Sequence, residues 1–157
     1  MNKGFLLRLF LLLILSWAWM PGKARAQEAV RVGILPFPIY AADREKGSAW
    51  PARVAMTLSA ELKKDGQILL VGEDKIRAAL EQAGAAEVDE SLAREVGQKL
   101  EADFMVLGSV TQINGSISLD IRVVDVFQPD ALVQVFRVGK SPDELEAITR
   151  QASREGV

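Results

Sequence analysis

The sequence predicts an α/β (α+β) fold in which helices pack against one mixed sheet of about five strands. Two short apolar runs, residues 31–37 and 67–71, flank a segment of helical periodicity, and this favours a βαβ unit with a right-handed crossover. Farther along, Asn114–Gly115 separates two longer runs and is typical of a tight antiparallel hairpin. The predicted order is therefore a βαβ unit followed by helices, an antiparallel three-strand meander and a C-terminal helix.

The first predicted strand, residues 31–37, is almost continuously apolar, as expected of a strand buried on both faces. It ends at Pro36 and Pro38, because proline cannot donate a hydrogen bond to a neighbouring strand. We expect the polar residues 40–49 that follow to form an exposed loop.

Three helices are predicted before the hairpin. The first begins at Trp50–Pro51 and the second after Gly72, with the strand 67–71 between them. The second helix ends at Gly84, and Asp89 caps the third. Their apolar positions recur at helical spacing: Val54, Leu58 and Leu62; Ile76, Ala79, Leu80 and Ala83; Leu92, Val96 and Leu100.

The meander is predicted from three strand-forming runs, residues 104–113, 116–127 and 132–138, with a second turn at 128–130. Along residues 116–123 apolar and polar side chains alternate strictly. One face of the middle strand should therefore pack on the core while the other meets water.

The C-terminal helix follows a predicted capping box, in which Ser141 is the cap, Pro142 the first helical residue and Glu144 the reciprocal partner. Its apolar face should consist of Leu145, Ile148 and Ala152.

The first 26 residues have the three-part layout of a cleavable signal peptide. Lys3 and Arg8 form a basic head, an apolar run reaches Met20, and Ala24-Arg25-Ala26 offers a small-x-small cleavage pattern. A membrane anchor is the alternative, but the apolar run falls short of the roughly 20 residues that span a bilayer. We therefore expect a periplasmic protein whose only membrane contact is through this leader before cleavage, and a single mature domain at residues 27–157.

Composition excludes several classes of function. The leader holds four of the 19 basic residues and none of the 21 acidic ones, which leaves the mature chain with a net charge of −6 and argues against nucleic-acid binding. The chain has no cysteine, so it forms no disulfide and is not a lipoprotein. It has no histidine either, which removes the commonest general base and zinc ligand. We expect no cofactor, no bound metal and no catalysis.

Several segments, in order, resemble the amino-terminal domain of TolB and the related CsgG-, FlgO- and LpoB-like modules of the Gram-negative envelope. Residues 32–37 (VGILPF) are similar to the family's VAVLPF opening, and residues 106–110 (VLGSV) to the end of its GADYVLTGSV segment. Residues 119–126 (LDIRVVDV) are similar to its ARLVDV strand. The resemblance covers roughly residues 30–138 and implies a module that binds other envelope proteins without performing chemistry.

The sequence departs from this family in three places. Gln128-Pro129-Asp130 stands where the family often has a Thr-Gly-Glu turn, and no cysteine is present for the lipid carried by CsgG- and LpoB-type relatives. TolB carries a propeller after this module, whereas residues 1–157 contain none. An accessory or adaptor of an outer-membrane or envelope assembly is therefore expected. A truncated N-terminal domain of a longer propeller or repeat protein stays open, as does a periplasmic small-molecule-binding domain with a pocket beyond the ends of the first two strands.

The best candidate contact is the loop at residues 36–50, which displays Phe37, Tyr40, Arg44 and Trp50. Aromatic residues on a polar loop are typical of a binding edge. The alternative is that Phe37 and Trp50 pin the loop to the core, because large apolar side chains are usually buried.

The outer strand of the meander, residues 132–138, is a second candidate. An unpaired strand edge can accept a partner strand, with Arg137 at the contact. Arg137 and Lys140 could equally block that edge, as charges often do.

Other patterns carry no chemistry. Gly108-Ser109 lacks both a G-x-S-x-G context and a base, so a small pair inside a central strand explains it better. Glu73 and Asp74 complement the helix dipole at a helix start. Asp120 and Asp125 are five residues apart on one strand and should point to opposite faces.

Export gives the first testable prediction. The chain recovered from the periplasm should begin at Gln27, because the signal peptidase cleaves after Ala26. Intact-mass measurement of the fractionated protein checks this. Full-length chain that still carries Met1 and resides in the cytosol would contradict it.

Overall fold

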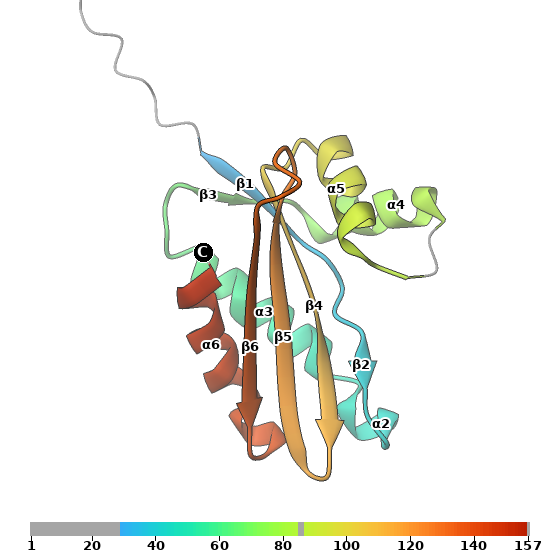
Figure 1. Cartoon of the computed structure of the whole chain (residues 1–157), viewed down its shortest axis with the longest axis vertical. Coiled ribbons are helices and arrows are strands. Elements are labelled where there is room, and N and C mark those ends of the chain that lie inside the picture. Colours follow the sequence, from blue (N-terminus) through green and yellow to red (C-terminus); the bar gives the residue numbers. More distant parts are fainter. Residues whose placement is uncertain (1–28, 85–86, 157) are drawn as a thin grey trace, which may run out of the picture.

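The computed structural model describes residues 29–84 and 87–156, with the main chain alone at residues 44, 46 and 156, and the predicted leader at residues 1–26 lies outside this part. Figure 1 shows one sheet with helices on both sides. The strands are β1 (Val30–Ile34), β2 (Ile39–Tyr40), β3 (Ile68–Leu70), β4 (Phe104–Ile113), β5 (Ser116–Asp125) and β6 (Leu132–Gly139). The helices are α2 (Arg44–Gly47), α3 (Trp50–Leu62), α4 (Glu73–Ala83), α5 (Glu90–Lys99) and α6 (Leu145–Gly156), with a short 3-10 turn η1 (Pro142–Glu144) before α6.

The sheet is mixed, as predicted, and has the strand order β3-β1-β4-β5-β6. β1 runs parallel to both β3 and β4, which makes the βαβ unit, and β4, β5 and β6 form the antiparallel meander. β2 pairs with β4 beyond the end of β1. β4 therefore lies at the centre of the fold.

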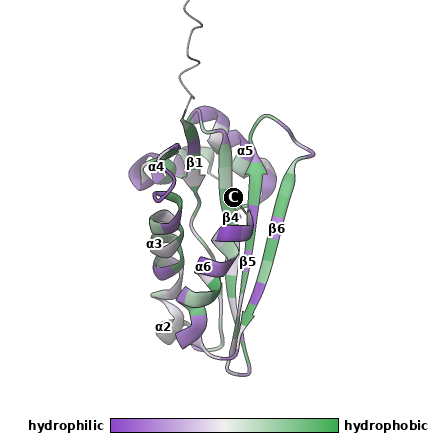
Figure 2. Cartoon of the chain, turned by 90° about the vertical axis from the view of Figure 1, so that its left-hand side faces the viewer, coloured by the Kyte–Doolittle hydropathy of each residue, from purple (hydrophilic) through white to green (hydrophobic). Residues whose placement is uncertain are grey.

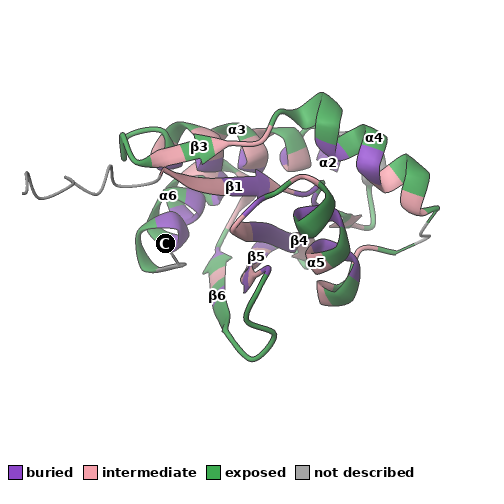
Figure 3. Cartoon of the chain, turned by 90° about the horizontal axis from the view of Figure 1, so that it is seen from above, coloured by how far each residue is buried: buried purple, intermediate pink, exposed green. Residues whose placement is uncertain are grey.

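Two apolar layers hold the helices to the sheet. α3 and α6 pack on one face over Val106, Val110, Ile117, Leu119 and Ile121. α4 and α5 pack on the other face, over Met105, Leu107, Val124 and Val126. Seen from above, β1 and β4 lie buried between these layers, whereas β6 is mostly exposed (Figure 3).

Most local predictions are confirmed. Asn114 and Gly115 have φ of 51° and 83°, the left-handed pair that a type I′ hairpin requires. Gly84 ends α4 with φ of 63°, and the Asp89 carboxylate accepts the Leu92 N–H at 2.8 Å as the cap of α5. Asp120 and Asp125 lie on opposite faces of β5, because they are an odd number of residues apart.

The predicted first strand is shorter than residues 31–37. It stops at Ile34 and the chain rejoins β4 as β2, because Pro36 and Pro38 interrupt the ladder. The stretch at 40–49 was predicted as a loop and instead contains the end of β2 and the short helix α2.

The capping box is wrong. Residues 142–144 form a 3-10 turn, and the Ser141 side chain makes no capping hydrogen bond. The Glu144 carboxylate accepts the Lys140 N–H at 3.2 Å instead of reaching the Ser141 N–H. The α-helix itself begins at Leu145, and its apolar face of Leu145, Ile148 and Ala152 is buried as predicted.

Gly108 allows the closest packing in the centre of the sheet. A Cβ atom at this position would lie 2.0 Å from the backbone oxygen of Asp120 and 2.7 Å from the ring of Phe37. Only glycine fits there, so the Gly108-Ser109 pair is explained by packing inside β4.

Substitution of Gly108 by alanine should therefore destabilise the fold by about 3 kcal/mol, because backbone on the neighbouring strand must move. Gly66→Ala is the matched control: its Cβ would meet nothing within 4 Å, and the free energy of unfolding should change by less than about 1 kcal/mol. Urea titration of both variants measures the difference. Equal midpoints would show that the sheet yields at Gly108.

Candidate functional site

One half of the sheet has an uncovered face. Side chains of β4 and β5 that lie between Val110, Ile117 and Leu119 point away from α3 and α6, yet none of them belongs to the core beneath α4 and α5. Figure 1 shows why: α4 and α5 gather at one end of the sheet, while the long strands continue past them. We call this surface the open face; it consists of Tyr40, Ser109, Thr111, Ile113, Ser116, Ser118, Phe136 and Val138.

Four large apolar side chains frame the open face. Their exposed fractions are 54% for Tyr40, 65% for Ile113, 57% for Phe136 and 59% for Val138. Figure 2 shows that β6, which supplies two of them, is hydrophobic along most of its length. Single exposed apolar residues are ordinary, but several on one face mark a surface that is covered in use.

The register of the strands places hydroxyl groups between these apolar residues. Tyr40 lies opposite Thr111, Thr111 opposite Ser118, and Ser118 opposite Val138, in one row across four strands. The next row contains Ser109, Asp120 and Phe136. The open face thus has a small, hydroxyl-bearing centre with an aromatic or aliphatic side chain at each side.

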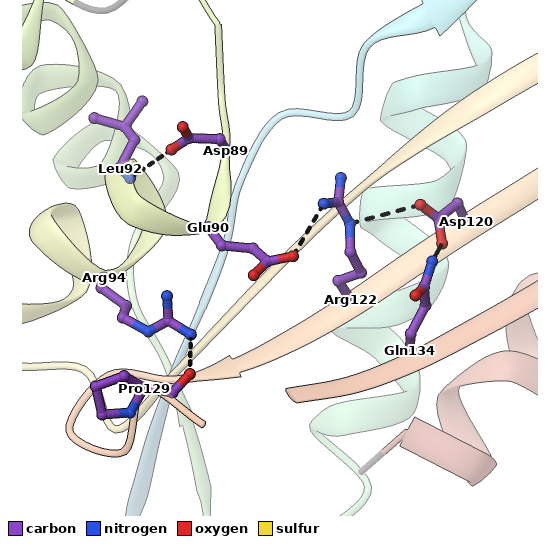
Figure 4. A network of polar contacts seen from close by, with 8 residues as sticks. All are labelled: Asp89, Glu90, Leu92, Arg94, Asp120, Arg122, Pro129 and Gln134. Atoms are coloured by element: carbon purple, nitrogen blue, oxygen red, sulfur yellow. Dashed lines mark hydrogen bonds and ion pairs between the residues drawn. The ribbon is translucent and has the colours of Figure 1, made fainter. Parts of the chain in front are cut away.

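A polar network marks the boundary between the open face and the half covered by α5 (Figure 4). Arg122 Nη1 on β5 donates to Glu90 Oε1 on α5 at 3.2 Å, and Arg122 Nε lies 3.5 Å from Asp120 Oδ2, an electrostatic contact without a hydrogen bond. The other oxygen of Asp120 accepts the Gln134 amide of β6 at 3.0 Å. The network joins α5, β5 and β6, and its three charged side chains are a quarter to a third exposed.

The predicted loop residues fall into two groups. Phe37 and Trp50 are buried, with exposed fractions of 3% and 6%, and this matches the alternative that they pin the loop to the core. Tyr40 is exposed on the open face, and Arg44 begins α2 with a side chain outside the described part. Of the four, the structure brings only Tyr40 into the open face, and its role in binding stays a prediction.

Arg137 lies on the opposite side of β6 from Phe136. It pairs in register with Leu119, faces the α6 layer and forms an ion pair with Glu155 of that helix. Its Nη1 also donates to the backbone oxygen of Phe136 at 2.7 Å. This arrangement matches the alternative in which Arg137 blocks the strand edge.

Ile113, Phe136 and Val138 were missed from sequence. The polar side of β5 was recognised from its alternation, but the faces of β6 follow only from its register with β5. Phe136 pairs with Asp120 and Val138 with Ser118, so both share the polar side of the hairpin. Without this register, the sequence of β6 alone does not show which of its side chains share the polar side of β5.

A groove of about 660 Å³ lies at the end of the sheet where β1 begins and β5 ends. The predicted small-molecule pocket beyond the carboxyl ends of β1 and β3 would be at the opposite end. The acidic groups in the groove are already engaged: Asp103 accepts the Arg31 N–H at 2.7 Å, and Glu101 pairs with the Arg31 guanidinium at 3.1 Å. Asp125 accepts two backbone N–H groups of the following turn.

The described residues contain no group of three or more acidic side chains placed to hold a metal ion. Within the same ranges, no helix has the length and apolar character needed to cross a membrane.

Fold and open face together define the class: a one-sheet α/β module with two helices covering one face and the other face half bare. No family model and no curated protein matches the sequence. Among solved structures, the fold is similar to the C-terminal domain of LpoB from Salmonella enterica, with a TM-score of 0.58 and 13% identity over 73% of this chain and 84% of that one. Lipoprotein GNA1162 from Neisseria meningitidis gives a TM-score of 0.54 and 15% identity over 73% of this chain and 83% of that one.

TolB from Acinetobacter baumannii is also similar, with a TM-score of 0.51 and 11% identity over 80% of this chain but only 26% of TolB. The fold resemblance to TolB- and LpoB-like modules, predicted from short motifs, is therefore confirmed. At these identities the likeness establishes the fold alone.

The network around Arg122 yields a prediction about stability. Arg122→Ala leaves Glu90 and Asp120 without their shared cation and should lower the free energy of unfolding by about 1–2 kcal/mol, between the values typical of exposed and buried pairs. The control is Arg77→Ala, which removes exposed pairs within α4 and should cost less than about 0.5 kcal/mol. Thermal and urea unfolding measure both; an equal loss would show that the network contributes no more than a surface pair.

Proposed function

We propose that this chain is an exported, non-catalytic module of the bacterial envelope that binds another envelope protein through its open face. The proposal takes residues 27–157 as one mature domain in the periplasm. The observation that carries it is the framed surface itself, on which four exposed apolar side chains surround a centre of serine and threonine hydroxyls.

The solved relatives support the envelope setting. The fold is shared with a domain of LpoB and with a protein described as a lipoprotein, and the family resemblance implies modules that bind envelope proteins. The leader supplies the route of export, and the net charge of −6 after its removal suits a protein that does not bind nucleic acid.

The composition of the open face suits a protein partner. Tyrosine and phenylalanine are enriched in the cores of protein interfaces, and tyrosine also among the residues that dominate binding energy. Tyr40 and Phe136 lie on opposite sides of the open face. The hydroxyls between them can exchange hydrogen bonds with water for bonds to a partner at little cost. A partner segment should therefore place apolar side chains over the two sides and polar groups over the centre.

The surroundings of Ser109, the possible nucleophile of the Gly108-Ser109 pair, argue against catalysis. Ser109 lies in the middle of β4 on the open face, half-buried, with no histidine in the chain to take its proton. Its nearest acidic neighbour in register, Asp120, is already bonded to Gln134 and faces Arg122.

Site-specific crosslinking tests the proposal. A photoreactive residue at Tyr40 or at Val138 should capture the same partner in cells of the native host, because both positions lie in one row of the open face. Met56 is the control position: it is 71% exposed on α3, in the layer on the other side of the sheet, and should not capture that partner. Trp50 is unsuitable because it is buried.

A substitution then tests how much Phe136 contributes to the binding energy. Phe136→Ala should weaken binding of the captured partner at least tenfold, about 1.4 kcal/mol, with little effect on unfolding because the ring is exposed. Capture at Met56 alone, or an affinity unchanged by Phe136→Ala, would assign binding to another surface.

A further inference from the structure

The outer edge of β6 is the longest unpaired strand edge in the described sheet. β6 has eight residues and no proline, whereas β3 at the other edge has three residues. Proteins usually protect such edges with charges, prolines or very short strands, because an open ladder pairs with other chains.

The hairpin determines which backbone groups of β6 face outward. A two-residue type I′ hairpin closes on a hydrogen-bonded pair, here Ile113 and Ser116, and bonded pairs then alternate along the ladder. The even-numbered residues of β5 are therefore bonded to β4 and the odd-numbered ones to β6. The Asp125 N–H, which donates to the Ala131 oxygen, follows the same alternation. On β6, the outward groups consequently belong to Leu132, Gln134, Phe136 and Val138.

The side chain of Arg137 reaches the middle of this outward row, although the backbone of Arg137 pairs with β5. Its Nη1 donates to the Phe136 oxygen at 2.7 Å, and its other terminal nitrogen pairs with Glu155 on α6. Its Nε is buried without a hydrogen-bond partner. The guanidinium thus bends over the strand edge, is held there by the helix layer, and covers the Phe136 oxygen, one of the acceptors that an added strand would use.

We propose that Arg137, held by Glu155, is an edge guard that prevents β6 from pairing with β6 of a second copy of this chain. The inference is independent of the proposed function, because it concerns the backbone edge and not the side chains of the open face.

A second copy is the occupant because the unguarded edge complements itself. An antiparallel pairing about a two-fold axis at Phe136 places Phe136 opposite Phe136 and Gln134 opposite Val138, with both rows of outward groups matched. Arg137, the single charged residue of β6, then lies opposite Val135, so no like charges meet across the axis. The Arg137 guanidinium would lie between the two ladders in this pairing.

The test is the oligomeric state of the purified chain 27–157 and its variants by sedimentation and light scattering. The original chain should be monomeric at micromolar concentration, and Arg137→Ala should double the apparent mass. Amides of Gln134, Phe136 and Val138 should become protected from hydrogen exchange in that dimer. Glu155→Ala, which removes only the anchor, should shift the equilibrium in the same direction and serves if Arg137→Ala fails to fold.

Two further variants test whether dimer formation depends on the β6 edge or on the general loss of an ion pair. Arg53→Ala removes another ion pair between elements, Arg53 of α3 with Glu146 of α6 at 3.0 Å, which involves no residue of β6, and should remain monomeric. Gln134→Pro in the Arg137→Ala background should restore the monomer, because the lost N–H faces outward and takes no part in the ladder with β5. The proposal is overturned if folded Arg137→Ala and Glu155→Ala stay monomeric, if the original chain already pairs through β6, or if the edge pairs only with a strand from another protein.

Discussion

The structure depends on a difference in length between strands and helices. β4 and β5 are ten residues each and so reach about 33 Å, whereas α4 and α5 have eleven and ten residues and reach only about 16 Å. Two helices gathered at one end cannot cover strands of twice their length. The other face has α3 and α6, which together extend along the meander, and the asymmetry leaves the open face bare.

Along β5, the side chains on the α5 side of the sheet change from apolar to polar where α5 ends. Val124 packs beneath α5, and two residues earlier Arg122 meets Glu90 at the edge of that helix. Beyond it, Asp120, Ser118 and Ser116 continue the same side of the strand in water. The polar network thus ends the apolar core at the last residue that α5 covers. The apolar side chains of Tyr40, Ile113, Phe136 and Val138 do not follow this change to polar residues, which is why we assign them to a partner rather than to the fold.

Local signals predicted most of the elements, because each depends on a few adjacent residues. Asn114–Gly115 specified the hairpin, Asp89 the start of α5, and the alternation after Ser116 the two faces of β5. β2 was missed because two residues have no periodicity, and they form a strand only where β4 offers a partner. The 3-10 turn before α6 was missed because Glu144 could reach either Lys140 or Ser141, and only the three-dimensional path of the chain decides between them.

The candidate site was only partly predictable for a related reason. The burial of Phe37 and Trp50 follows from their apolar area, and Tyr40 could be identified as a candidate from its polar loop. The face on which Phe136 and Val138 lie depends on register. A shift of one residue between β5 and β6 would have directed the ring of Phe136 and the methyl groups of Val138 at α6.

Phe136 shows how the two properties of β6 are linked. Its ring belongs to the open face, while its backbone oxygen points outward from the strand edge and accepts a hydrogen bond from Arg137. A strand with an apolar face and an unguarded edge has the two features that promote aggregation, and Arg137 removes one without altering the other. The guard has a cost, since its Nε remains buried and unpaired, and a buried donor without an acceptor is unfavourable. That cost is tolerable if the open face must stay apolar to bind its partner, because the edge is then the one place where self-association can be opposed.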